Sequence, residues 1–379
     1  MSNKSLIILR GKRYALGNTA HWLGWCLSCW LLAACSAREE QVTLPLPTGH
    51  YEGPVTYQGT DLRVTLDVRE PTTGQLQADM RFPEIEGISF PVAKLRYKEP
   101  QLNFEQEPSQ PGNITVSAIR EGDFLRGIFT WDTIQTEFVW ARRGQAVERP
   151  YREQAVQLTG ISAGEGNSLL ARFLIPQDTA LRYPAVALLP DIATAGAAAA
   201  RADLLARHGF VVLLVPPLAV ANTTDSLGLR LAKAAITVCR AEKSVDSSRV
   251  GLWVRGPRAG LAVLGASQLQ PPVAFLVIEG VSIQSAAEAK PFQQIARQRI
   301  PILGLYGMAD TTVQASESAK RLRAAIGSQR RNAVRVYAKA NRNLTIAGYT
   351  NAKGQWQWPQ PAPGYIDELL TWLRQQTTR

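Results

Sequence analysis

The chain has 379 residues, of which 45% are hydrophobic and 19% are charged, the composition of an ordinary globular protein with ample apolar content. The formal net charge is +11, but four of the positive charges, Lys4, Arg10, Lys12 and Arg13, fall in the first 34 residues. No run of lysine and arginine is interleaved with aromatic residues, and no nucleic-acid-binding motif occurs, so nucleic acid is not among the expected partners.

The N-terminus has the pattern of an export signal. A basic, polar segment reaches Tyr14, and an apolar stretch, Ala15–Ala34, follows it. This stretch ends in Leu32-Ala33-Ala34-Cys35, which resembles the lipobox of bacterial lipoproteins. The resemblance implies a signal peptide over residues 1–34, a lipid on Cys35 that binds the membrane, and, because Ser36 is not aspartate, the outer membrane of a bacterial envelope. A plain secretory signal and a transmembrane anchor are the alternatives.

Four cysteines occur, and two of them, Cys26 and Cys29, lie inside the predicted signal. Cleavage would leave Cys35 and Cys239. Since Cys239 falls in an apolar run with helical spacing, we expect a buried structural thiol and no disulfide.

A polar tether is predicted over residues 35–49, and short runs in which apolar and polar residues alternate follow over residues 50–143. About eight short runs, such as Leu62–Val68 and Asn113–Ser117, are separated by glycine-containing turns, which predicts an antiparallel barrel or sandwich. With Gly53, Gly127 and its closing run Phe138–Arg143, this segment loosely resembles a lipocalin-like domain found ahead of some bacterial hydrolase domains. The resemblance implies either a ligand-holding barrel or a filled barrel that only packs against its neighbour. Residues 144–160 are charged and are predicted to be a linker.

Residues 161–379 alternate between apolar runs of strand length and helical segments, which predicts an α/β fold with a mainly parallel sheet and helices on both faces. The predicted strands are Leu169–Ile175, Ala185–Leu189, Phe210–Val215, Val250–Val254, Val273–Ile278, Ile302–Tyr306 and Val334–Tyr337. The predicted helices are Ala195–Arg207, Leu227–Glu242, Pro257–Ser267, Ser285–Arg297, Ser316–Ile326 and Tyr365–Gln376. Functional residues of such sheets lie at the carboxyl ends of the strands.

This order of elements resembles the α/β-hydrolase fold, nearest to its dienelactone-hydrolase and acyl-esterase branch. The resemblance rests on Tyr183–Leu189, Leu205–Val212, Asp246–Leu252, Pro301–Val313 and Pro363-Gly364-Tyr365. It implies a nucleophile on a sharp turn between a strand and a helix, then an acid and a histidine farther along the chain.

The residues that would carry this chemistry are largely missing. The five positions of the predicted elbow are Val254-Arg255-Gly256-Pro257-Arg258, so Gly256 stands where the nucleophile would be. Of the three histidines, His21, His50 and His208, none follows the acid Asp310, and Arg342 occupies the position that resembles the histidine loop. An arginine cannot act as a general base in a protein. No intact catalytic residue is therefore predicted, and the triad-equivalent positions are Gly256, Asp310 and Arg342.

The groups that would stabilise an oxyanion are also altered. Asp191 follows the strand that ends at Leu189, and a carboxylate there would repel a developing negative charge. Pro257 has no backbone N–H to donate. We expect Asp310 and Arg342 to form an ion pair in place of the usual bond between the acid and the histidine.

Binding is the function that remains. Arg255, Arg258 and Arg342 are predicted to gather with Asp191 at the former active-site mouth, where three guanidinium groups suit a carboxylate or phosphate. No metal-ligand spacing or cofactor motif occurs, so no metal and no cofactor are expected.

The sequence thus predicts a catalytically degenerate hydrolase-like lipoprotein, a pseudoenzyme that binds an unidentified small ligand or a protein partner. Two alternatives stay open, an active serine-type esterase or acyl hydrolase, and a small-ligand carrier that uses the β-domain.

Overall fold

The computed structural model describes residues 46–378, apart from Glu86, 107–112, 163–167, Thr179, 218–225 and 257–258. The predicted signal, Cys35 and most of the tether lie outside the described residues, as do Pro257 and Arg258. No helix among the described residues is long and apolar enough to span a membrane.

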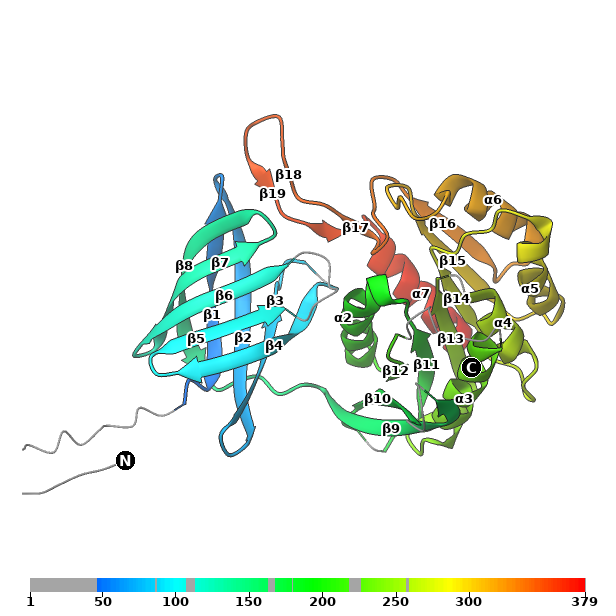
Figure 1. Ribbon diagram of the computed structural model, residues 1–379, viewed down its shortest axis with the longest axis horizontal. Coiled ribbons are helices and arrows are strands. Elements are labelled where there is room, and N and C mark those ends of the chain that lie inside the picture. The colour runs from blue at the N-terminus through cyan, green and yellow to red at the C-terminus, as the bar shows by residue number, and fades with distance from the viewer. Residues whose placement is uncertain are drawn as a thin grey trace, which may run out of the picture. The chain divides into compact units, whose positions relative to one another are not determined.

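Eight antiparallel strands in sequence order close into a barrel, so of the two predicted β-folds the structure adopts the barrel (Figure 1). The strands are β1 (Gly49–Tyr57), β2 (Thr60–Thr72), β3 (Gln75–Arg81), β4 (Ser89–Lys98), β5 (Gln101–Gln106), β6 (Ile114–Glu121), β7 (Phe124–Trp131) and β8 (Ile134–Gly144). Alternation decides which side chains face inward: Ile114, Val116 and Ala118 of β6 are buried, and the residues between them are more exposed.

The barrel interior is packed with apolar side chains. Tyr51, Phe129 and Trp140 are fully buried there, and the rings of Phe138 and Trp140 stack with centroids 3.9 Å apart. Gly127 is required where β6 and β7 approach, because a Cβ at this position would lie 1.9 Å from the carbonyl oxygen of Ser117.

A second sheet contains eight strands in the order β16-β15-β14-β13-β11-β12-β10-β9 (Figure 1). Its strands are β9 (Tyr151–Ser162), β10 (Ser168–Pro176), β11 (Tyr183–Leu189), β12 (Val211–Leu214), β13 (Val245–Arg255), β14 (Leu276–Glu279), β15 (Ile302–Gly307) and β16 (Ala333–Tyr337). The pairings from β12 through β11 and β13 to β16 are parallel, while β10 is antiparallel to both β12 and β9.

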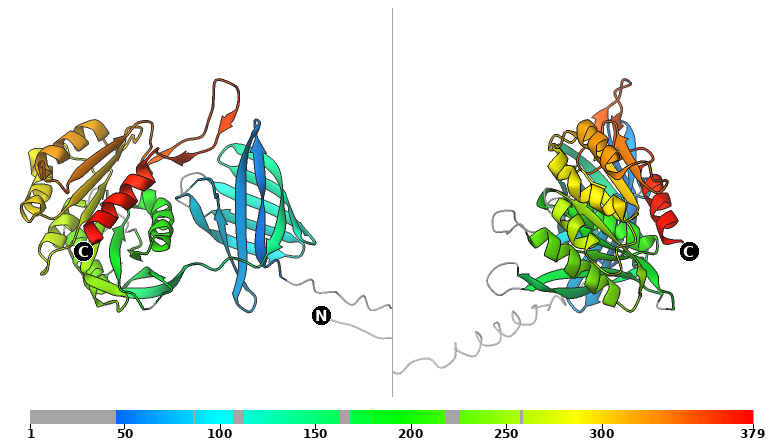
Figure 2. Two further views of the ribbon diagram at one scale, coloured as in Figure 1. Left: turned by 180° about the vertical axis from the view of Figure 1, so that it is seen from behind. Right: turned by 90° about the vertical axis from the view of Figure 1, so that its right-hand side faces the viewer.

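Helices cover both faces of this sheet because its strands are apolar on both sides. The helices are α2 (Ala195–Arg207), α3 (Leu227–Ala241), α4 (Ala259–Ser267), α5 (Ala286–Arg297), α6 (Ala315–Ile326) and α7 (Tyr365–Thr377). Ala185 and Ala187 of β11 pack in one core with residues of α3–α6, and Val186 and Leu188 pack in another with residues of α2 and α7. The right-hand view of Figure 2 shows α7 on the side away from α5 and α6.

The predicted fold class, α/β with a mainly parallel sheet, is wrong for this chain. The described residues are mostly β: one whole sheet of eight strands is an antiparallel barrel, and the described residues form only six α-helices. The alternation of strands and helices that indicates an α/β class is confined to the C-terminal part of the chain, and the barrel and the antiparallel strands β9 and β10 outweigh it.

The predicted linker over residues 144–160 is wrong for most of its length. β9 (Tyr151–Ser162) occupies it and pairs with β10 over nearly the whole strand. The charged residues that favoured a linker are accommodated because β9 is an edge strand and most of its side chains are exposed.

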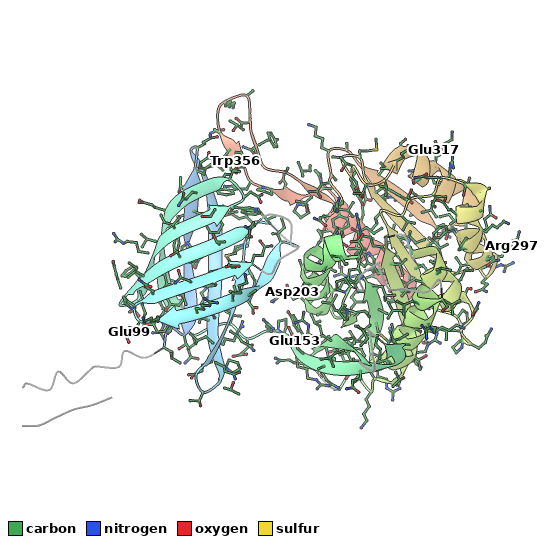
Figure 3. The ribbon with its side chains drawn as sticks, viewed as in Figure 1. Glu99, Glu153, Asp203, Arg297, Glu317 and Trp356 are labelled. Carbon is green, nitrogen blue, oxygen red and sulfur yellow. The ribbon has the colours of Figure 1, made fainter. Side chains whose placement is uncertain are left out.

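Residues 46–379 make one compact unit, and aromatic residues connect its two sheets. Trp358 lies 5.8 Å from Trp131 and 6.5 Å from Phe129, measured between ring centroids, and is buried within the barrel core. It belongs to a segment in which β17 (Thr345–Ile346) pairs with β20 (Gln360–Pro361) and β18 (Tyr349–Thr350) pairs with β19 (Trp356–Gln357). Figure 3 labels Trp356, whose ring meets that of Tyr57 at 5.5 Å.

Candidate functional site

The turn between β13 and α4 is built around a glycine. Gly256 follows the last residue of β13 and has a φ of +84°, a conformation that L side chains rarely adopt. A Cβ on Gly256 would lie 3.1 Å from the Cβ of Asp191, which is tighter than ordinary contact. The chain therefore leaves β13 through Gly256 in this conformation, and the residue has no side chain to react, while Pro257 and Arg258 lie outside the described residues.

Arg255, beside this glycine, is the centre of a buried ionic network. Its Nη1 donates to Oε1 of Glu279 at 3.0 Å, and its Nη2 donates to Oδ2 of Asp310 at 3.1 Å. Arg255 is only 8% exposed, and both carboxylates are buried more deeply. A buried guanidinium needs such partners, since an unpaired buried charge is strongly destabilising.

The strand order explains this meeting. Arg255 and Glu279 are the last residues of β13 and β14, and they are direct partners in the parallel register. Asp310 comes just after β15, the next strand of the sheet (Figure 1). The network thus lies at the carboxyl ends of neighbouring parallel strands, the position at which such sheets place their functional groups.

Several members of this network were not predicted from the sequence. Glu279 also accepts from Nη2 of Arg201 at 2.7 Å and from Nε1 of Trp253 at 3.0 Å. Nε of Arg201 donates to the hydroxyl of Tyr365 at 3.2 Å, and burial raises the pKa of Tyr365 to about 12. Burial alone would lower the pKa of Arg201, but Glu279 and Tyr365 outweigh this effect and raise it. Two features of the sequence could have indicated these members: Glu279 is a charged residue at the end of an apolar strand, and Arg201 lies within an alanine-rich helix. A charge in such a setting needs a buried partner.

The predicted ion pair between Asp310 and Arg342 is wrong. Arg255 is the ion-pair partner of Asp310, whose Oδ1 also accepts from the backbone N of Thr312 at 2.9 Å. Arg342 contributes its backbone carbonyl, which accepts from Nη1 of Arg255 at 2.5 Å. Arg255 takes the place expected for Arg342 because it leaves the sheet directly beside the acid.

Asp191, which follows β11, is the third carboxylate near Arg255. It precedes a 3-10 turn, η2 (Ile192–Thr194), and its Oδ1 accepts from the hydroxyl of Thr194 at 2.6 Å. Its Oδ2 is 3.4 Å from Nε of Arg255, close enough for an ion pair. The Nε–H of Arg255 is nevertheless buried without a hydrogen-bond partner, because this contact lacks hydrogen-bond geometry.

In the predicted anion site, the guanidinium group of Arg255 already has partners. Arg255 is engaged by three carboxylates, Asp191, Glu279 and Asp310. With Arg201, the described residues of the network comprise three carboxylates and two guanidinium groups, which leaves one negative charge in excess among them. Arg258 lies outside the described residues. The excess of carboxylate disfavours an anionic guest at this point.

An apolar pocket of about 270 Å³ opens beside the network. Asp191 and Arg255 are its only charged lining residues among those described. Its apolar walls come from the ends of β11 and β13, from the residues after β12, and from α3 and α4, and include Leu189, Val215, Leu227, Leu231, Val254 and Ala262. The volume is slightly below the usual range for small-molecule pockets, about 300–1,000 Å³, and suits a compact ligand.

The two described histidines lie away from this pocket. Nδ1 of His50 is 2.8 Å from Oδ1 of Asp67 in the barrel, and Nδ1 of His208 is 3.3 Å from Nη2 of Arg374. No group of three His, Cys, Asp or Glu residues able to hold a metal occurs among the described residues. Cys239 is fully buried, and burial raises the pKa of its thiol.

Solved structures that resemble this chain are esterases and dienelactone-hydrolase-like enzymes. A bacterial heroin esterase is 18% identical, with a TM-score of 0.45, over 61% of this chain and 86% of its own. A dienelactone hydrolase-like promiscuous phosphotriesterase from metagenomic libraries is 16% identical, with a TM-score of 0.44, over 60% of this chain and 99% of its own. Esterase 2 of Thermogutta terrifontis, phosphoramylated by tabun, is 14% identical, with a TM-score of 0.41, over 52% of this chain and 86% of its own. No family model and no curated protein matches the sequence.

Proposed function

We propose that this chain is a non-catalytic binding module that holds a small apolar molecule in the pocket beside Arg255 and Asp191. The observation that carries the proposal is that Asp191 lies against Gly256 and pairs with Arg255, which is itself bound to Glu279 and Asp310. An apolar pocket remains next to a turn that carries no nucleophile.

Hydrolysis by a serine-type mechanism would need a nucleophile and a base in contact. Thr194 and Thr312 are the aliphatic hydroxyl residues bonded to this network in the described part of the chain, and each is held by a carboxylate, Asp191 or Asp310, rather than by an imidazole. The described histidines form other contacts. The retained parts of the site therefore support binding without turnover, since none of its described residues supplies the nucleophile and base that the active-esterase alternative needs.

A dye-binding assay and a hydrolysis assay together distinguish a binding module from an enzyme. We would use the chain from Ser36 to Arg379, which retains the whole compact unit, and titrate it with the neutral fluorescent dye N-phenyl-1-naphthylamine. The expected result is saturable dye binding with no hydrolysis of short or medium acyl esters and no labelling by a fluorophosphonate. Ester turnover with labelling at one serine or threonine would contradict the proposal.

Two exposed residues supply a matched pair of variants. Ile192 lines the pocket and is 50% exposed, while Leu181 is 57% exposed and is not among the lining residues. Ile192→Asp places a charge at the pocket and should weaken dye binding about tenfold, whereas Leu181→Asp should leave it unchanged. Equal effects of the two variants would place the dye elsewhere.

We also propose that a lipid on Cys35 holds the protein at the outer membrane, on the strength of the Leu32-Ala33-Ala34-Cys35 pattern. Expression with an alkyne fatty acid should label the protein, and Cys35→Ala should abolish both the label and sedimentation with the outer membrane. An unlabelled protein that is cleaved and released would favour the plain secretory signal instead.

A further inference from the structure

The head group of the ligand can be inferred from the polar corner of the pocket. This inference rests on the proposed function and specifies its ligand. The corner consists of two side chains, Asp191 and Arg255, in a wall that is otherwise apolar.

Arg255 has a hydrogen-bond donor to spare. Its Nη1 and Nη2 are bound to Glu279, Asp310 and the carbonyl of Arg342. Its Nε–H has no hydrogen-bond partner although the residue is more than nine-tenths buried. Buried donors of this kind are nearly always satisfied, so an acceptor that enters the pocket would gain the bond that is missing.

Asp191 has an acceptor to spare. Its Oδ1 is held by Thr194, while its Oδ2 faces Arg255 at 3.4 Å without a hydrogen bond, and about 29% of its side chain is exposed. A group that donates to Oδ2 and accepts from Nε–H would satisfy both atoms at once. The two atoms are close enough for a single small group to reach both.

We propose that the pocket takes a neutral ligand with an apolar body and a hydroxyl or primary amide head, which donates to Asp191 and accepts from Arg255. A carboxylate cannot donate, and the network already holds one excess negative charge. An ammonium group cannot accept from Nε–H. An alcohol or amide meets both requirements without adding charge to a buried site.

Four eight-carbon or isosteric probes test this assignment by calorimetric titration of the chain from Ser36: 1-octanol, heptyl methyl ether, octanoate and octylammonium. We expect 1-octanol to bind at least about tenfold more tightly than each of the other three, the size expected for one hydrogen bond to a charged group. The ether has the shape of the alcohol and accepts a hydrogen bond but cannot donate one, so it isolates the role of Asp191.

Two variants test whether the preference for 1-octanol depends on the carboxylate of Asp191. Asp191→Asn keeps the size of the side chain and removes its charge, so 1-octanol should lose about tenfold in affinity while octanoate gains. Leu181→Asp should leave all four affinities unchanged. Thermal melting of each variant shows whether it is folded. If Asp191→Asn is unfolded, the comparison of alcohol and ether in the unaltered chain still decides the question.

The outcomes distinguish this inference from the function on which it rests. Tightest binding of octanoate or octylammonium would overturn the head-group assignment, and so would equal binding of all four probes. In those cases the pocket would still bind apolar molecules. Failure of every probe, together with failure of the naphthylamine dye, would overturn the proposed function itself.

Discussion

The backbone conformation at Gly256 disfavours a side chain at the position where a nucleophile would stand. Its φ of +84° and the nearby Asp191 both disfavour any side chain at this position. Gly256→Ala should therefore lower the free energy of unfolding by about 1–3 kcal/mol, measured by urea denaturation. Gly260→Ala, in helix α4, is the control: its Cβ would make an ordinary contact, 3.4 Å from Pro291, and stability should stay the same or rise by up to about 1 kcal/mol. Equal effects would mean that the turn does not require glycine.

Glu279 is the residue on which the buried network most depends. It accepts from Arg201, Arg255 and Trp253 and is only 1% exposed. Glu279→Gln removes the charge that two buried guanidinium groups share, so unfolding should become easier by about 3–5 kcal/mol. The matched variant Glu317→Gln changes an exposed pair with Arg321 on α6 (Figure 3) and should have no measurable effect. A small loss at Glu279 would show that the network stabilises little.

The reactivity of the Cys239 thiol tests whether its sulfur atom is buried. The side chain lies in the core between α3 and the sheet, and burial raises the pKa of its thiol. The reactive thiolate is therefore scarce and inaccessible in the folded protein. In the chain from Ser36, iodoacetamide should fail to modify Cys239 until denaturant unfolds the protein, as followed by mass spectrometry. Rapid modification of the native protein would contradict the packing of α3.

At the scale of elements, Asp79 ties barrel strand β3 to the segment that leads into β9. It accepts from Arg69 at 2.8 Å and from Nε of Arg149 at 2.8 Å. Burial alone would raise the pKa of Asp79, but the hydrogen bonds and charges of Arg149 and Arg69 outweigh it and lower the pKa. The ionised carboxylate is thus the form that stabilises the fold.

The sign of the resulting pH dependence follows from linkage. A carboxyl whose folded pKa lies below its unfolded value of about 4 stabilises the protein above that pH and loses this contribution as the pH falls. The difference in unfolding free energy between the unaltered chain and Asp79→Asn should be constant from about pH 7 to 5 and shrink below about pH 4. Asp123→Asn, whose carboxylate makes only an exposed pair with Arg142, should show a much smaller difference throughout. A difference that grew on acidification would contradict this account.

At the scale of the whole molecule, Trp358 connects the segment after β16 with the barrel. Its ring is 7% exposed and packs against Phe129 and Trp131. Trp358→Ala should cost about 3–5 kcal/mol through lost burial and a cavity, and calorimetry should show the melting transition at a lower temperature. Tyr349→Ala removes an aromatic ring that is 51% exposed in the same segment and should leave the transition nearly unchanged. Similar melting of both variants would mean that Trp358 is not held in the barrel core.

The sequence by itself determined the local features. Hydrophobic periodicity located the barrel region, seven of the eight strands of the second sheet and all six described helices, with α2 (Ala195–Arg207) at its observed bounds, but it missed β9. The absence of a side chain at Gly256 and of a histidine after Asp310 was also plain from the residues. Such features depend on neighbours in the chain, and the patterns report them directly.

Only the tertiary structure decided which charges meet. Arg201 and Glu279 are 78 positions apart and Arg255 and Asp310 are 55 apart, so no local pattern joins them. The order of the strands placed Arg255 beside Asp310, where Arg342 was expected. It also placed β9 at the edge of the second sheet, so that the described residues of the two sheets are together mostly β. The partner of a buried charge depends on which strands become neighbours and on the reach of each side chain, and neither is encoded by spacing along the chain.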